Sequence, residues 1–237
     1  MIPEKNRLWL SPPDVGELEE AAVVEALRSG WVAPVGPEVD RFESELSRFC
    51  GSQFAVALAS GSAALHLGLL GLGVVPGDEV VVPTMTFGAT AFAVTYCGAT
   101  PVFLDSEPLS WNLDPNVLYE FLSMRAKVGN LPSAIVCVDV FGRPCDYKSI
   151  LAVVEAFEIP VLADSAESLG AEANGQMTGS FGLASVFSFN GNKIMTTSGG
   201  GMLVSDDESL IAKARFRSAQ SREPFPWYEH EEIGFNY

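Results

Sequence analysis

Histidine and paired cysteines are scarce in this chain of 237 residues, which holds two histidines and four cysteines. The cysteines are Cys50, Cys97, Cys137 and Cys145, and none of them forms a C-x-x-C pair. Because structural zinc sites need closely spaced cysteine and histidine ligands, we expect no metal site. The cysteines are expected to be reduced thiols, as in the cytoplasm.

Basic residues are also few: 14 Lys and Arg stand against 30 Asp and Glu, which gives a formal net charge of −16. Such a charge repels a nucleic-acid backbone, so no nucleic-acid partner is expected. An anionic cofactor remains compatible with the sequence. It would have to be held by local backbone amides and hydroxyls.

Two features bear on targeting. Met1 to Asn6 has no basic segment followed by an apolar run, so no signal peptide is expected and the protein is predicted to be cytoplasmic. The stretch 49–77 has no charged residue, but it is interrupted by Ser60, Gly61 and Ser62. It is therefore predicted to be a buried strand, a turn and a helix, with no membrane partner.

Short apolar runs alternate with helical patterns along the whole chain. This alternation predicts an α/β domain over residues 1–237, with a mainly parallel mixed sheet covered by helices on both faces. Ligands of such sheets gather at the carboxyl ends of the strands. Strands are predicted at 54–58, 79–82, 100–104, 134–140, 160–163, 184–188 and 200–205, and helices at 17–28, within 36–49, and at 63–72, 89–97, 115–124 and 148–157.

The first chemical motif is the turn Ala59-Ser60-Gly61-Ser62-Ala63, between a predicted strand and a predicted helix. Free amides and the positive end of the helix dipole make such a turn a phosphate site. Ser62 can add a hydroxyl. A simple helix cap is an alternative interpretation.

The second motif is Asp164, which closes the apolar strand Ile159-Pro160-Val161-Leu162-Ala163. A carboxylate at a strand end can meet a cationic nitrogen of a ligand. It can equally cap the next helix, and the residues alone leave both interpretations open.

The third motif is Lys193, which follows a strand and precedes the glycine-rich turn 198–201. Lys193 is therefore a candidate for imine formation with a cofactor, which needs a positioned and partly desolvated amine. The alternative interpretation is a solvated lysine in a surface loop.

Two nucleotide-binding motifs can be excluded. Residues 71–76 have Pro76 in place of the last glycine of a dinucleotide fingerprint, and residues 191–193 lack the Gly-Lys-Ser/Thr of a P-loop.

The three motifs have one joint explanation in pyridoxal 5′-phosphate (PLP). A phosphate cradle anchors this cofactor, a carboxylate keeps its pyridine nitrogen protonated, and a lysine binds it covalently. His66 needs no role in this scheme and is predicted to be a satisfied core histidine.

Several further segments resemble the DegT/DnrJ/EryC1/StrS sugar aminotransferases, which have the PLP fold type I. The resemblance runs from Leu10 to Tyr237. It is carried by Leu10-Ser11-Pro12-Pro13, the segment 30–39, Pro83-Thr84-Met85-Thr86-Phe87, the segments 98–105 and 140–144, and Ile233-Gly234-Phe235-Asn236-Tyr237. Ser188-Phe189-Asn190-Gly191-Asn192-Lys193-Ile194 and Asp164-Ser165-Ala166-Glu167-Ser168-Leu169-Gly170 are most similar to the branch that aminates C4 of UDP-linked 4-keto-6-deoxy sugars, in bacillosamine-type and exopolysaccharide synthesis.

The resemblance implies a role for each matching residue. Lys193 would be the Schiff-base lysine and proton shuttle, and Asp164 would pair with the pyridinium. Phe87 would stack on the ring, and Glu167 stands near the ring's 3-hydroxyl, where many members have glutamine or histidine. The other implied cofactor contacts are the phosphate-binding Gly61, Ser62 and Ser188, together with Ala63, Asn190 and Asn236, the last reaching the phosphate of a neighbouring subunit.

The function implied by the resemblance is PLP-dependent transamination of a nucleotide-linked 4-keto-6-deoxy sugar, which is UDP-linked in this branch, with an amino donor such as glutamate. The resemblance also implies a homodimer with shared active sites. Lys193 argues against the sister dehydratases, which have histidine at this position. The family's smaller C-terminal domain is expected to be absent from this chain. An alternative is an inactive PLP-binding or dimer-forming module of the same family.

Overall fold

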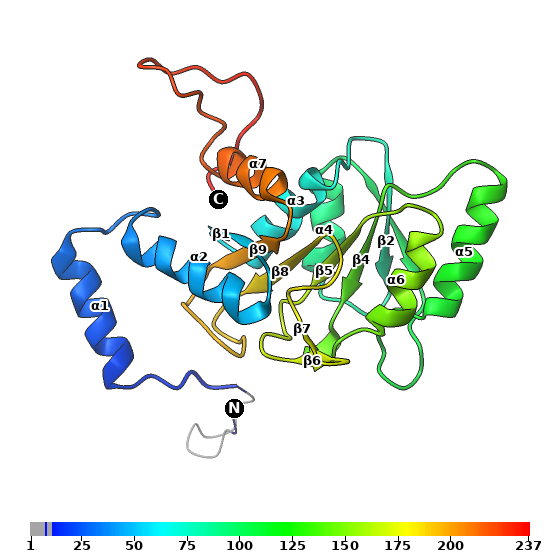
Figure 1. Ribbon diagram of the computed structural model, residues 1–237, viewed down its shortest axis with the longest axis horizontal. Helices are drawn as coiled ribbons and strands as arrows, with labels where there is room; N and C mark the ends of the chain where they lie inside the picture. The colour runs from blue at the N-terminus through cyan, green and yellow to red at the C-terminus, as the bar shows by residue number, and fades with distance from the viewer. Residues whose placement is uncertain (1–7, 9–10) are drawn as a thin grey trace, which may run out of the picture.

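The computed structural model describes Leu8 and residues 11–237 (Figure 1). Two expectations concern residues outside this part. The prediction of no signal peptide rests on residues 1–6, and Leu10 opens the first segment that resembles the family.

Within the described residues, seven strands form one twisted sheet in the order β1-β9-β8-β5-β4-β2-β3. β9 pairs antiparallel with both of its neighbours, and the other adjacent pairs are parallel. The predicted mainly parallel mixed sheet is therefore confirmed. The strands are β1 (Phe54–Leu58), β2 (Glu79–Pro83), β3 (Thr100–Leu104), β4 (Ala134–Val138), β5 (Val161–Asp164), β8 (Ala184–Ser188) and β9 (Gly201–Ser205).

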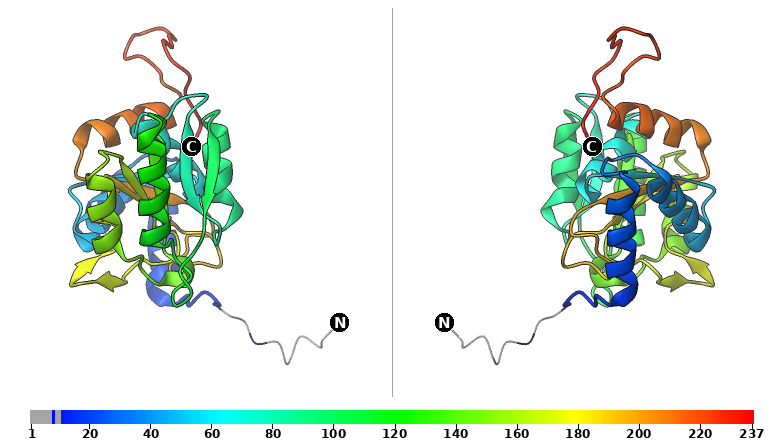
Figure 2. Two further views of the ribbon diagram at one scale, coloured as in Figure 1. Left: turned by 90° about the vertical axis from the view of Figure 1, so that its right-hand side faces the viewer. Right: turned by 90° about the vertical axis from the view of Figure 1, so that its left-hand side faces the viewer.

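Helices cover both faces of the sheet, and Figure 2 shows α4 and α5 on opposite sides of it. Alternate residues of one strand enter different cores: Val80 and Val82 pack with α3, α4 and α7, whereas Val81 packs with α5 and α6. A third cluster joins α2 to β1, β8 and β9. The helices are α2 (Pro37–Cys50), α3 (Gly61–Gly71), α4 (Gly88–Tyr96), α5 (Pro115–Lys127), α6 (Tyr147–Glu155) and α7 (Glu208–Ser218).

The uncharged stretch 49–77 folds as predicted into β1, a turn and α3. Eight of the eleven residues of α3 are buried, which explains why this helix shows little amphipathic pattern. Among the described residues, no helix is both long and apolar enough to cross a membrane.

Apart from small shifts in the bounds of other elements, four elements differ from the predictions. β4 ends at Val138, before the predicted residue 140, because the chain turns into the 3₁₀ helix η2 (Val140–Gly142), where Phe141 has φ = 52°. α7 was not predicted, and neither was the hairpin of β6 (Glu172–Ala173) and β7 (Gln176–Met177). The strands β6 and β7 were missed because two residues are too few to show the alternation of apolar and polar residues that marks a strand. α7 buries mainly Leu210, Ile211 and Ala214 among charged residues.

The two ends of the described chain leave the core. None of the 13 residues of α1 (Glu17–Ser29) is buried. After α7 the chain loops outward and returns, so that Asn236 forms a β-bridge with Ala219 (Figure 1). Phe235 and Tyr237 pack on His66, whose Nδ1 lies 3.2 Å from the Tyr237 hydroxyl. His66 is thus a buried and partnered core histidine, as predicted.

Candidate active site

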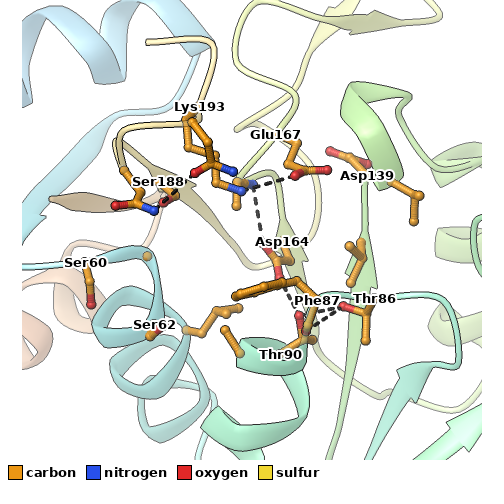
Figure 3. A pocket seen from close by; sticks show the side chains of 18 of the residues that line it. Ser60, Ser62, Thr86, Phe87, Thr90, Asp139, Asp164, Glu167, Ser188 and Lys193 are labelled. Atoms are coloured by element: carbon orange, nitrogen blue, oxygen red, sulfur yellow. Dashed lines mark hydrogen bonds and ion pairs between the residues drawn. The ribbon is translucent and has the colours of Figure 1, made fainter. Parts of the chain in front are cut away.

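A cavity of about 430 Å³ lies at the carboxyl ends of the strands, a size typical of small-molecule sites. Its walls come from the β1–α3 turn, the β2–α4 loop, the segment after β4, the end of β5, and the segment from the end of β8 to residue 200. The three sequence motifs therefore meet in one place, although they are far apart in the chain (Figure 3). This convergence is what the strand-end rule for parallel sheets predicts.

The β1–α3 turn forms one wall. Ser60 caps α3 by accepting a hydrogen bond from the Ala63 amide at 3.1 Å, so the cap interpretation holds for this residue. The amides of Gly61 and Ser62 occupy the first positions of the helix, where no intrahelical acceptor is available. A Cβ atom at Gly61 would lie 2.8 Å from the Cβ of Ser188, so only glycine fits there. The turn thus combines a cap with an anion cradle.

Asp164 lies at the floor of the cavity and is 5% exposed. Its Oδ2 accepts a hydrogen bond of 2.7 Å from the Thr90 hydroxyl, and its Oδ1 accepts a longer one, of 3.3 Å, from the amide of Ala166. Burial raises the pKa of Asp164 to about 6, although these hydrogen bonds and the charge of Lys193 oppose the shift. No helix begins directly after Asp164 in the described chain, so the helix-cap alternative does not apply.

Lys193 points into the same cavity, and its side chain is 12% exposed. The alternative of a freely solvated loop lysine is therefore wrong. Its Nζ lies 3.2 Å from Oε1 of Glu167. The other carboxylate oxygen of Glu167 accepts a 3.0 Å hydrogen bond from the amide of Phe141. Glu167 thus ties the lysine to the strained turn after β4.

The remaining predicted residues divide into two groups. Phe87, Ser188 and Asn190 line the cavity, and the ring of Phe87 is 79% exposed at its mouth. Ala63 and Asn236 lie outside it. Ala63 is buried behind the turn and its amide is used by Ser60, whereas Asn236 is exposed on the returning C-terminal segment.

Two buried polar residues of the cavity wall were not predicted from the sequence. Thr90, on α4, holds Asp164. Asp139 follows β4 and accepts four hydrogen bonds from the Cys145 amide and the hydroxyls of Tyr147, Ser165 and Ser168. The available signal for Asp139 was its place directly after an apolar strand, which it shares with Asp164.

The charges of the cavity are unbalanced. Among the described lining residues, Lys193 is the one basic side chain, against the acids Asp139, Asp164 and Glu167. A buried carboxylate that still has room for a cation, beside an amide cradle for an anion, suits a ligand with a protonated ring nitrogen and a phosphate. The residues present therefore fit PLP.

Comparison with known proteins places this geometry in a family. The model of the DegT/DnrJ/EryC1/StrS aminotransferase family matches residues 13–237. EpsN of Bacillus subtilis, named without firm assignment as a pyridoxal phosphate-dependent aminotransferase, is 47% identical over 232 residues, covering 98% of this chain and 60% of EpsN. GDP-perosamine synthase of Caulobacter vibrioides is 39% identical over 231 residues, covering 98% of this chain and 61% of that protein.

Solved structures agree. The PLP-form of Spr1654 from Streptococcus pneumoniae, provisionally described as a sugar aminotransferase, superposes with a TM-score of 0.86 at 31% identity, over 96% of this chain and 62% of that one. The chain thus spans about three fifths of the length of the curated relatives named above. Because the family model covers nearly the whole sequence, the chain belongs to the DegT/DnrJ/EryC1/StrS aminotransferase family.

Proposed function

We propose that this chain binds PLP in the strand-end cavity and serves the transfer of an amino group to a nucleotide-linked keto-sugar. The observation that carries the proposal is the convergence of Lys193 and Asp164 on one cavity from different strand ends. A lysine and a buried acid placed around one site are what PLP chemistry requires of a protein. Family membership supports the same reaction class.

Each part of the cofactor has a matching group in the cavity. The amides of Gly61 and Ser62 and the hydroxyl of Ser188 would hold the phosphate, and Asp164 would hold the proton on the ring nitrogen. Phe87 stands where it can cover the ring face. When bound, PLP supplies the electron sink that stabilises the charge left after a proton is removed from the amino donor.

Lys193 would move that proton. Its Nζ is the basic group of the described cavity lining, and general base catalysis needs such a group within hydrogen-bond reach of the reacting atom. The 3.2 Å contact with Glu167 holds the ammonium toward the Phe141 side of the cavity. Glu167 would thereby set the orientation of the amine before the substrate enters.

For the acceptor, the proposal is a UDP-linked 4-keto-6-deoxy sugar, with glutamate as donor. It is supported by the segments around Asp164 and Lys193. One relative is named as a GDP-perosamine synthase, so the nucleotide has to be tested directly. The assay measures 2-oxoglutarate released from glutamate with UDP-linked and GDP-linked 4-keto-6-deoxy sugars. Preference for the UDP form supports the finer proposal, and preference for the GDP form replaces it.

The alternative is a module that binds PLP or forms dimers without turnover. A PLP-binding module predicts a PLP absorption band and no 2-oxoglutarate with any sugar nucleotide, whereas a module that only forms dimers predicts neither. Release of 2-oxoglutarate that depends on Lys193 excludes it. Absence of both the band and the activity would contradict PLP binding itself.

We further propose that a second copy of the chain completes the site. Phe235 and Tyr237 stack with a centroid distance of 5.0 Å and both pack on His66, so the intervening Asn236 is turned outward. The single basic residue of the described cavity lining also leaves an anionic substrate short of cationic contacts.

Mixing two inactive variants tests this shared site. Lys193→Ala damages the cavity of its own chain, whereas Asn236→Ala would damage the cavity of the partner. In a mixed dimer both lesions fall on one site and the other stays intact, so the mixture should regain activity. If Asn236→Ala is fully active alone, or if mixing restores nothing, the sites are not shared through this residue.

A further inference from the structure

The carboxylate of Asp139 is almost completely buried, and it accepts four hydrogen bonds. The residue is 1% exposed, and its four bonds to neutral donors measure between 2.7 and 2.9 Å. Oδ1 accepts from the Cys145 amide and the Tyr147 hydroxyl, on the α6 side. Oδ2 accepts from the hydroxyls of Ser165 and Ser168, on the β5 side.

The β5 side of this arrangement bears directly on the cavity. Ser165 follows Asp164 and Ser168 follows Glu167. Oδ2 of Asp139 therefore accepts from two residues of the turn 164–168, each next to one of the two acids that line the cavity. The backbone reinforces the link, because the amide of Asp139 donates to the carbonyl of Asp164 at 3.1 Å. The carbonyl of Ser168 is itself held by the Thr178 hydroxyl.

We infer that Asp139 is a positioning residue that clamps the turn 164–168, and so fixes the two site acids relative to Lys193. The inference rests on the proposed function for its consequence in PLP binding, but the clamp itself is a property of the cofactor-free chain. Two of the four hydrogen bonds tie the turn to the buried carboxylate, and the other two anchor that carboxylate to Cys145 and Tyr147, so the turn is restricted far more than a solvated loop would be. Loss of such supporting contacts around a binding group commonly weakens binding about 10- to 100-fold at metal sites.

Two variants separate the effect of the hydrogen bonds to the turn from the effect of the negative charge of Asp139. Asp139→Asn removes the charge and forces the two serine hydroxyls from donors to acceptors. The double substitution Ser165→Ala and Ser168→Ala cuts the tie and leaves the charge of Asp139 in place. Ser185→Ala is the matched control, because Ser185 is equally buried and its hydroxyl donates a 2.9 Å hydrogen bond to the carbonyl of Phe181, outside the turn and the cavity.

The first readout is amide hydrogen exchange of Ala166 and residue 168 in the cofactor-free protein. Both amides are bonded within the turn, to Asp164 Oδ1 and to the carbonyl of residue 165. We expect exchange at these amides to rise about tenfold or more in Asp139→Asn and in the double variant, and to stay within about twofold in Ser185→Ala. Because PLP is absent, this result does not depend on the proposed function.

The second readout is the dissociation constant of PLP. It should rise about tenfold or more in both clamp variants and change less than about twofold in the control. Wild-type exchange rates and wild-type PLP affinity in the double variant would overturn the clamp. If the wild-type chain does not bind PLP, the proposed function fails, while the exchange measurement still decides whether Asp139 orders the turn. If Asp139→Asn does not fold, the double variant carries the test alone.

Discussion

The carboxyl ends of β4 and β5 each present a buried aspartate, yet the two sites are built in opposite ways. Asp139 at β4 accepts four hydrogen bonds, all of them 2.9 Å or shorter. Asp164 at β5 accepts one short bond from Thr90 and one of 3.3 Å from Ala166, and it lies beside Lys193 and the open cavity. The first carboxylate is saturated and the second retains acceptor capacity on the ligand side.

This difference indicates different roles: Asp139 supports the structure of the site, whereas Asp164 is available to a ligand. A saturated buried carboxylate orders the structure around it through its donors. Burial still raises the pKa of Asp139 above its usual range, because the four hydrogen bonds offset only part of the lost hydration. A buried carboxylate with few hydrogen bonds lowers the stability of the ligand-free protein, and a bound cationic ligand can offset this loss. Substitutions on the Asp164 side should therefore change binding and reaction with little loss of stability, whereas substitutions on the Asp139 side should lower stability as well.

The largest effect is expected at Lys193. Lys193→Ala removes the group proposed to move the proton, so transamination should fall by at least about 10³-fold, while PLP still binds non-covalently. Stability should change by less than about 1 kcal/mol, because the side chain of Lys193 lines a cavity and does not pack in the hydrophobic core. Release of 2-oxoglutarate and urea unfolding measure the two quantities. Lys213→Ala, on the exposed side of α7, is the control and should match the wild type.

Asp164→Asn should have the next largest effect. The neutral amide cannot hold the proton on the ring nitrogen, so the proton-transfer step should slow about 100-fold or more, and PLP should bind more weakly. Single-turnover absorbance changes with glutamate give the rate of this step. A change below about threefold would mean that Asp164 does not face the ring nitrogen.

Glu167→Gln tests the contact between the two sides of the cavity. Glutamine keeps the shape and can still accept from the Phe141 amide, but it loses the charge that attracts Lys193. We expect kcat to fall up to about tenfold with the PLP dissociation constant nearly unchanged. Equal losses in PLP affinity and in kcat would instead place Glu167 directly on the cofactor.

The smallest effect, and the one that contrasts the two aspartates most clearly, is on stability against pH. The pKa of Asp164 is raised by burial to about 6, so its stabilising contribution is present below about pH 4 and is lost as the pH rises through 6. Asp164→Asn has no such titration. The cofactor-free variant should therefore gain about 1–3 kcal/mol over the wild type between pH 4 and pH 7.

Asp139→Asn provides the opposite sign in the same experiment. The amide places an N–H donor where a carboxylate oxygen accepts from two hydroxyls, so the hydrogen bonds of this network are lost or reversed. Although burial also raises the pKa of Asp139, this mismatch should make the variant less stable than the wild type at pH 7, by about 1–3 kcal/mol. Urea unfolding of the cofactor-free proteins across this pH range gives both curves. If both substitutions destabilise the protein at pH 7, the contrast between the two carboxylates is wrong.

Much of this arrangement was predictable from the sequence, because strand ends are local features. The glycine turn at Gly61, the aspartate after β5 and the lysine after β8 are each marked by neighbouring residues, and the strand-end rule brings them together. Thr90 and the clamp of Asp139 were not predictable. Thr90 lies on α4 and its partner on β5, and the four donors of Asp139 come from two separate segments, 145–147 at the start of α6 and 165–168 after β5.

The missed elements have different explanations. α7 mixes charged and apolar residues with little helical period, and its start depends on the Asp207 side chain accepting from the Leu210 amide. The turn at Phe141, with φ = 52°, ended β4 earlier than its apolar run indicated. The N-cap of α7 is a local signal that the sequence analysis missed, whereas the turn after β4 is held by a contact between distant residues, the Phe141 amide and Glu167.

Covalent trapping of PLP tests the central claim most directly. The chain is incubated with PLP, reduced with borohydride, digested, and its peptides are mapped by mass. We expect the pyridoxyl group on Lys193, and no modified peptide from Lys193→Ala. Modification at another lysine, or none in a folded wild-type chain, would contradict the assignment of this cavity as the PLP site.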